Sequence, residues 1–252
     1  KDDAVAAGMK NDDVGIDAGG SGAQAYADAV ATYLALAVDR SADYWSSICS
    51  WVSNRDTIRN TFARQAIAMV WDYAEANPFS NSTGNFVGAV EWVARVVALL
   101  PGNTPSYAMQ NEAGAVIQKV PQPLVSTDPP YYDNISYADL SDFFYIWLRR
   151  SLAGIYPQLF ATMLVPKAEE LVATPYRFEG DKQKAKEFFE TGMQRVFSSI
   201  RIQSHSDYPI TVFYAFKQTE SDGNEDDADT PAVVTSTGWE TMLEALLKAG
   251  LV

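Results

Sequence analysis

The sequence predicts an α/β fold, with a mainly helical section over residues 1–120 and a strand-bearing section over residues 121–252. Two observations lead to this prediction. Apolar residues recur every three or four positions in several stretches, which is typical of helices with one buried face. After residue 120, short extended stretches alternate with such helical stretches, and the order strand, helix, strand, helix indicates an α/β fold.

The N-terminal section is expected to hold three helices. The first seventeen residues are polar and rich in aspartate, so we expect a loop or a poorly ordered arm there. A helix is predicted from Ala23 onward, and a second from Asp56 to Ala76. The stretch Asn77 to Asn85, rich in small polar residues with one Pro and one Gly, ends that helix. A third helix is predicted over about 86–100, before Pro101-Gly102.

The C-terminal section begins with a short extended segment, Pro123 to Thr127. A helix is expected after Ser136, because apolar residues follow at helical spacing, and another over residues 182–200. Tyr208 to Phe216 is the best strand candidate, since it is rich in β-branched and aromatic residues. A final helix should begin at Thr237 and stop at Gly250.

Composition excludes several classes of protein. The chain has 252 residues, 47% of them hydrophobic, so it can bury one good core or two modest ones. No apolar run approaches the ~20 residues of a membrane span, and the start does not resemble a signal peptide, so we expect a soluble, cytoplasmic protein. Its single cysteine, Cys49, and single histidine, His205, cannot build a Cys/His zinc cluster, so no metal is predicted. We interpret Cys49 as a buried thiol and His205 as a surface loop residue.

The net charge of −13 is unusual for a protein that binds nucleic acid, because phosphate contacts normally supply much of the affinity. Residues 219–230 contain six acids and no base, so about half of this excess lies in one predicted loop. That charge can stay solvated and remote from a binding surface. The acidic composition therefore does not exclude DNA as a partner.

The motif Asp128-Pro129-Pro130-Tyr131 follows the extended segment and fits methyl transfer to an aromatic amine. The lone pair of such an amine is delocalised, so its hydrogens must be held in a geometry that frees the nitrogen. The Asp128 carboxylate and the Pro129 carbonyl can each accept one amino hydrogen, while two prolines stiffen the loop. The Tyr131 ring can stack on a base that has been flipped out of a duplex. Taken alone, the tetrapeptide is also compatible with an ordinary turn.

The surrounding sequence closely resembles the adenine-specific DNA methylases that commonly carry an added zinc ribbon. The resemblance runs from about Gly19 to Val252, and it lies in STDPPYYDNISYADLSDFFYIWLRRSL, KAEELVATPYR, YPITVFYAFKQ, STGWETMLEALL, FARQAIAMVWDYAEANPF and STGNF. It implies a Rossmann-like sheet of the S-adenosylmethionine-dependent methyltransferase type. It also implies that Asp128, Pro129, Pro130 and Tyr131 orient and stack adenine in DNA, with S-adenosylmethionine as the cofactor.

Two features depart from the family pattern. The cysteines of the zinc ribbon are absent. The only candidates for the glycine-rich cofactor turn are Asp17, Gly19, Gly20 and Gly22, and the residues before them make a poor strand, so a flexible loop is the favoured interpretation. We therefore expect an upstream segment or a partner subunit to complete the cofactor site, as the non-Met start also suggests.

Other interpretations stay open. The acceptor of the methyl group is alternatively a cytosine amino group, RNA or a protein amide, although Asp at position 128 favours adenine. A non-enzymatic alternative is a catalytically silent DNA-recognition or assembly module of a restriction-modification or phage-defence system. Five bases are candidates for phosphate contacts, although a solvated helix face is the simpler interpretation for most of them: Lys167, Arg177, Lys182, Lys184 and Lys186.

Overall fold

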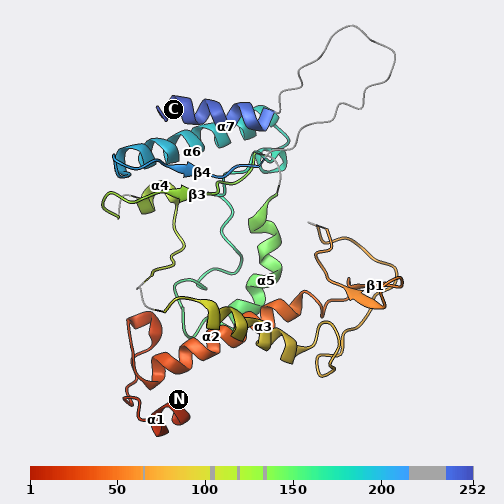
Figure 1. The fold of residues 1–252 in the computed structure, drawn as a ribbon. Helices are drawn as coiled ribbons and strands as arrows, with labels where there is room; N and C mark the ends of the chain where they lie inside the picture. The colour runs from red at the N-terminus through yellow and green to blue at the C-terminus, as the bar shows by residue number, and fades with distance from the viewer. Residues whose placement is uncertain (65, 103–105, 118–119, 133–134, 216–236, 252) are drawn as a thin grey trace. The chain divides into compact units, whose positions relative to one another are not determined.

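The structure is a computed structural model that describes residues 1–251 apart from 65, 103–105, 118–119, 133–134 and 216–236. The described chain forms two compact units (Figure 1). The first comprises Lys1–Ala108 and Tyr137–Lys167, and the second comprises Met109–Ser136 and Ala168–Val252. The predicted acidic loop at 219–230 lies outside the described residues. No helix in the described ranges is both long and apolar enough to cross a membrane.

The predicted Rossmann-like α/β fold is wrong. The chain is mostly helical, with 45% helix and 5% strand, and the sheets among the described residues have two strands each. The predicted strand 208–216 pairs only over β4 (Thr211–Val212), against β3 (Ser126–Thr127). A β-branched stretch forms a wide sheet only where other strands lie beside it, and the described residues offer β4 a single neighbour. Pro209, which has no N–H to donate, precedes the paired residues.

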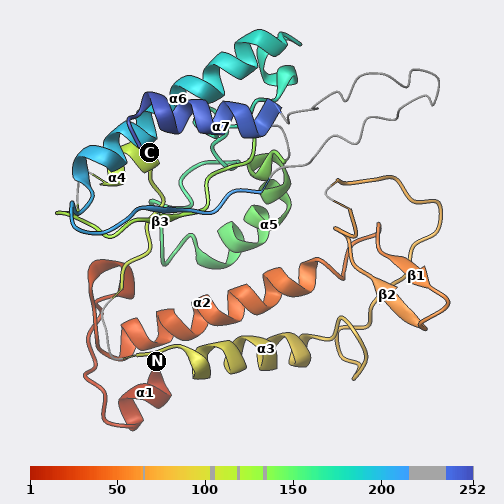
Figure 2. The ribbon, with the colours of Figure 1, turned by 45° about the horizontal axis from the view of Figure 1, so that its top comes forward.

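The first unit is built around α2 (Ala23–Ala42), which contacts both α3 (Phe86–Leu99) and α5 (Tyr137–Leu152) (Figure 2). All three helices were predicted from apolar spacing. Asn85 caps α3 because its side-chain oxygen accepts the N–H of Gly88 at 2.7 Å. A small buried cluster of Ala35, Leu152 and Phe160 joins α2 to the end of α5.

The first residues and residues 56–76 differ from expectation. The N-terminal stretch, predicted as a loop, contains α1 (Asp2–Ala6) and the 3-10 turn η1 (Ile16–Ala18). The predicted helix 56–76 is wrong, because β1 (Ser50–Val52) and β2 (Thr57–Arg59) form an antiparallel hairpin and no helix follows before α3 in the described residues.

The end of α2 explains why that helix does not form. The Asp43 carboxylate accepts hydrogen bonds from the Asn60 side chain at 2.7 Å and from the Phe62 backbone N–H at 3.1 Å, which holds the chain in a non-helical path. Large apolar residues later in the segment pack little against the rest of the described chain, since Met69 and Trp71 are 75% and 91% exposed. A helix of this length is only marginally stable without a packed face. Cys49, fully buried beside the hairpin, is a structural thiol as predicted.

Asp39 on α2 gives the first unit a pH-dependent stability. Burial raises the pKa of its carboxyl to about 6, and its Oδ1 is buried with no hydrogen-bond partner in the described chain. Because the folded pKa lies above the ordinary value, the fold favours the protonated form, and the free energy of unfolding should fall as pH rises from about 4 through about 6.

Asp39→Asn is therefore expected to raise the free energy of unfolding by about 1–2 kcal/mol at pH 7, after allowance for screening of this half-buried group. The gain should shrink towards zero below about pH 4, where the wild-type carboxyl is protonated in both states. Thermal unfolding at pH 4 and pH 7 measures this, with the exposed Asp72→Asn as the matched control. A gain that is the same at both pH values contradicts the assignment to Asp39 titration.

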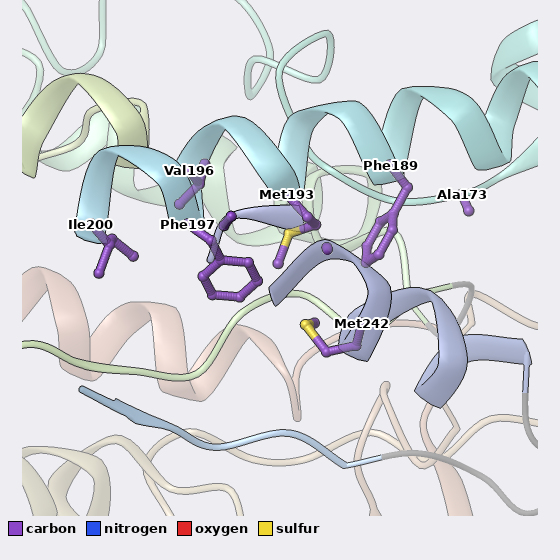
Figure 3. Packing of buried hydrophobic residues seen from close by; sticks show 9 residues of the cluster. Ala173, Phe189, Met193, Val196, Phe197, Ile200 and Met242 are labelled. Atoms are coloured by element: carbon purple, nitrogen blue, oxygen red, sulfur yellow. The ribbon is translucent and has the colours of Figure 1, made fainter. Parts of the chain in front are cut away.

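The second unit has its core between α6 (Lys182–Gln203) and α7 (Thr237–Lys248), both of which were predicted. Phe189, Met193 and Phe197 extend from α6 towards Met242 of α7 (Figure 3). The remaining buried members of this core are Ala173, Val196, Ile200, Ala245 and Ala249. The short helix α4 (Ala113–Val116) and the 3-10 turn η3 (Pro175–Phe178) also contact α6.

The strands β3 and β4 run parallel and lie against this core. Ser126 pairs with Thr211 and Thr127 with Val212. Val125 and Val212 pack on the α6/α7 core, whereas Leu124 and Phe213, the neighbouring residues in the alternation, are 67% and 59% exposed. The pair is thus buried on one face only, and its carboxyl ends lie side by side.

Candidate functional site

The predicted motif begins at the carboxyl end of β3. Asp128 is exposed, Pro129 is buried, and Pro130 and Tyr131 are half-buried. Buried Pro129 anchors the loop beneath the exposed carboxylate, and the fixed backbone angle of each proline restricts its motion. The structure therefore presents the Asp128 carboxylate to solvent on a stiff loop. Pro129 itself is buried, and the role of its carbonyl as an acceptor of an amino hydrogen stays a prediction.

The neighbouring strand brings Tyr214 beside the motif. Thr211 donates its backbone N–H to Val125 O at 3.0 Å and Phe213 donates to Thr127 O at 2.8 Å, so the parallel pairing continues to the last residue of β3. The next residue of the second strand, Tyr214, then meets Tyr131 edge to face, with ring centroids 5.3 Å apart at 87°. This is a favourable geometry for two aromatic rings.

Tyr214 links the motif loop to the start of α7. Its hydroxyl oxygen accepts the backbone N–H of Tyr132 at 3.2 Å, and the hydroxyl donates to the carbonyl of Gly238 at 3.3 Å. Its ring also lies nearly parallel to Trp239, with centroids 6.4 Å apart at 29°. Three aromatic rings, from the motif, the end of the β4 segment and α7, thus gather around the loop.

Tyr132, the residue after the motif, is held from the other side as well. Its carbonyl accepts the backbone N–H of Ala173 at 2.7 Å, and its ring meets Phe189 edge to face at 5.3 Å. Phe189 and Ala173 both belong to the buried core of the second unit. The loop is therefore fixed to the core immediately after Tyr131. Asp133 and Asn134, which extend the sequence match, lie outside the described residues.

Tyr214→Phe is expected to lower the free energy of unfolding of the second unit by about 1–2 kcal/mol. The hydroxyl's hydrogen bonds with the Tyr132 N–H and with the Gly238 carbonyl are both lost. Urea unfolding of the full chain measures this loss. Tyr208→Phe is the matched control, since that residue is 57% exposed and the substitution keeps the ring that meets His205. Equal effects of the two substitutions would contradict a linking role for Tyr214.

The cofactor candidates Asp17, Gly19, Gly20 and Gly22 lie in the first unit and do not form a nucleotide-binding turn. No strand precedes them, and Asp17 lies within η1. A side chain at Gly20 would clash with the Val14 carbonyl oxygen, and one at Gly22 would lie 2.5 Å from the Asp12 carboxylate. The space beside Gly20 and Gly22 is thus filled by this chain's own backbone and acids, whereas the space beside Gly19 is open. With no strand before them among the described residues, and with two of the glycines hemmed in, the residues at 17–22 do not fit S-adenosylmethionine.

Most of the candidate phosphate contacts are paired with acids. Lys167 contacts Asp142 at 2.7 Å and Arg177 contacts Glu170 at 2.7 Å, the latter pair largely shielded from solvent. Lys184 and Lys186 pair with Asp181 and Glu190 within one helical turn. Asp181 is also the N-cap of α6, and the backbone N–H of Lys184 holds the pKa of its carboxyl below the usual value. These four bases therefore have acidic partners within this chain, and Lys184 and Lys186 lie on the surface of α6.

A groove of about 910 Å³ opens in the second unit, away from the motif. Arg201, His205 and Tyr208 line it together with apolar residues of β4 and α7, and no residue of the motif does. His205 is a half-buried loop residue whose backbone N–H donates to the Pro123 carbonyl at 3.1 Å. Within the described ranges, no group of three His, Cys, Asp or Glu side chains is placed to hold a metal ion.

Sequence reasoning located the motif but not its aromatic neighbours. Tyr214 was assigned to a strand and Trp239 to the apolar face of the last helix, without a role for either. The available signal was the parallel pairing of two strands, because residues after the carboxyl ends of adjacent parallel strands lie near each other.

The fold and this site define a mainly helical protein of two units with an Asp-Pro-Pro-Tyr loop at the end of a parallel strand pair. No protein-family model matches the chain, and neither a curated protein nor a solved structure does. The resemblance to adenine-specific DNA methylases therefore stays a prediction.

Proposed function

We propose that this chain supplies the base-binding loop of an adenine-specific DNA methyltransferase. The observation that carries the proposal is the exposed Asp128 carboxylate beside the Tyr131 ring, on a loop fixed to the core at the next residue. A rigid loop matters because an orienting group acts only when it is held close to its working geometry.

In this proposal the Asp128 carboxylate accepts a hydrogen bond from the adenine amino group. This hydrogen bond favours a geometry in which the lone pair of the nitrogen points away from the ring system. Tyr131 stacks on the base, and Tyr214 and Trp239 support the Tyr131 ring and the loop. Flipping a base out of a duplex costs a few kcal/mol, and stacking on an aromatic ring, worth about 1–3 kcal/mol, offsets part of that.

S-adenosylmethionine is the expected methyl donor, and we assign no residue of this chain to it, because residues 17–22 do not fit it. The proposal places the donor site in a partner subunit or in a segment outside these residues. The same misfit favours a second candidate function, a catalytically silent DNA-recognition or assembly module. The two candidates differ in whether the adenine amino group itself is recognised.

Fluorescence anisotropy with a labelled single-stranded oligonucleotide distinguishes them. One probe carries a single adenine, and the matched probe carries unsubstituted purine, which lacks the amino group. The proposal expects the adenine probe to bind about 10–150-fold more tightly, since a hydrogen bond to a charged group is worth about 1.5–3 kcal/mol. Equal binding favours the silent module, and a preference for a cytosine probe favours the alternative acceptor. Label transfer from tritiated S-adenosylmethionine to adenine in DNA tests the reaction itself, once the partner or segment that carries the donor site is present.

Tyr131→Phe is expected to bind the adenine probe nearly as tightly as the wild type, whereas Tyr131→Ala should bind it about 5–150-fold more weakly. Stacking requires the ring, and its loss removes about 1–3 kcal/mol. Anisotropy titrations of both variants measure the difference. If Phe proved as damaging as Ala, the hydroxyl and not the ring would be the group that contacts the base.

A further inference from the structure

The first unit exposes a continuous apolar surface on α2 and α3, which we name the α2–α3 face. It is a shallow hollow of about 340 Å³ between the two helices, lined by Val30, Tyr33, Leu34, Val90, Val93, Ala94, Val97 and Ala98. All eight lining residues are apolar or aromatic. The α2 side is open to solvent, with Val30 40%, Tyr33 39% and Leu34 43% exposed.

The composition of α3 makes this exposure unusual. Ala89 is its one buried residue, while Val87, Val96 and Leu99 are 63%, 51% and 84% exposed. A surface helix of a monomer normally carries polar residues opposite its buried stripe. At helical spacing the side of α3 opposite Ala89 carries the apolar Val87, Ala94 and Ala98 beside Glu91. Contiguous apolar patches on soluble proteins often mark interaction sites, so this surface is a candidate interface.

The charges on α3 favour a second copy of this chain as the partner that covers the α2–α3 face. Glu91 and Arg95 are the charged residues of this helix, both exposed and 3.7 Å apart in an ion pair one turn along the helix. When two copies of α3 pack antiparallel about a two-fold axis near Val93, Glu91 of each copy lies beside Arg95 of the other. The contact is then self-complementary, as a two-fold interface requires.

The net charge of the whole chain favours the same surface. The chain carries −13, so two copies repel each other at most contacts, whereas α3 is neutral overall. A partner recognised by its own charge would be expected to be basic and to bind an acidic surface instead. Ala94 and Ala98 also line the α2–α3 face, and small side chains let two helix backbones approach closely.

The size of the surface sets the expected strength. With 14 residues, α3 is about 21 Å long, and a layer of two helices is about 20 Å wide. The footprint is then ~400 Å² per copy, or ~800 Å² in total. This is below the ~1,000 Å² of a stable specific interface, so the association should be weak. Two such layers form an arrangement of four helices, a common architecture.

We propose that the α2–α3 face joins two copies of this chain in a weak two-fold dimer, with α3 of one copy antiparallel to α3 of the other. The dimer should have a dissociation constant in the micromolar range. This inference does not depend on the proposed function, because the face belongs to the first unit and the motif to the second.

Sedimentation equilibrium of the full chain from about 1 to 200 µM tests the dimer. Glu91→Arg and Arg95→Glu each place like charges together, so each should weaken self-association at least tenfold. The double swap should restore it, and an equimolar mixture of the two single variants should associate more tightly than either alone. Both side chains are more than half exposed, so the variants should fold.

Two further variants complete the test. Ala98→Asp puts a charge in the α2–α3 face and should leave the chain monomeric at every concentration, whereas Glu187→Arg, an exposed charge reversal on α6, should not change association. A wild type that is monomeric up to 200 µM overturns the proposal. A dimer that is unaffected by both single swaps also overturns the antiparallel α3 contact.

Discussion

Asp128→Ala is expected to reduce methyl transfer to adenine by at least tenfold and to remove the preference for adenine over purine, while the fold stays intact. The carboxylate is exposed at the end of β3, so its removal leaves the core of the second unit unchanged. What is lost is a charge-assisted hydrogen bond to the amino group, worth about 1.5–3 kcal/mol, or roughly 10–150-fold.

The measurements are label transfer from tritiated S-adenosylmethionine in the presence of the partner or segment that carries the donor site, anisotropy of the chain with the two probes, and circular dichroism to verify folding. Glu187→Ala removes an exposed acid from the same unit and serves as the control for net charge. Asp128→Asn keeps an acceptor oxygen without the charge, so it should fall between the wild type and the alanine variant. Retention of more than about a tenth of the activity by Asp128→Ala would show that the carboxylate does not orient the amino group.

The helices were the part of the fold that the sequence predicted best. The start of α3 was predicted at about residue 86, and the structure places it at Phe86. The physical cause of this start is Asn85, whose side chain caps the helix. The same holds for α6, which begins after the Asp181 cap. A capped helix with one apolar face is specified by residues that are neighbours in the chain, so its signal is local.

The errors came from contacts between residues far apart in the chain. Residues 56–76 have the apolar spacing of a helix, but Asp43 binds the backbone N–H of Phe62, 19 positions away. The α/β prediction failed because strand-like composition does not state how many strands will pair, and β4 finds only β3 among the described residues.

The candidate site divides in the same way. Asp128 to Tyr131 were found because the motif is contiguous and follows a local extended segment. Tyr214, whose hydroxyl accepts the Tyr132 N–H, lies 82 positions along the chain. Only the register of β3 against β4 brings it to the motif, and one sequence by itself does not provide that register.

Phe189→Ala is expected to lower the free energy of unfolding of the second unit by about 3–5 kcal/mol, because a fully buried ring would be replaced by a cavity. This is a large share of the 5–15 kcal/mol that is typical of a domain, so the midpoint of unfolding should move to a clearly lower urea concentration. The ring also packs against Tyr132 at 5.3 Å, which ties the core to the motif loop.

Urea unfolding measures the loss, and Phe213→Ala is the matched control, since the same side chain there is 59% exposed and should cost less than about 1 kcal/mol. Phe189→Leu keeps most of the volume and should remain folded, with a loss below about 1.5 kcal/mol. Because that variant still lacks the ring that meets Tyr132, its preference for the adenine probe over purine should fall several-fold. If Phe189→Leu keeps the full preference, the hydrogen bonds of the loop with Tyr214 and Ala173 hold it in place without the help of the Phe189 ring.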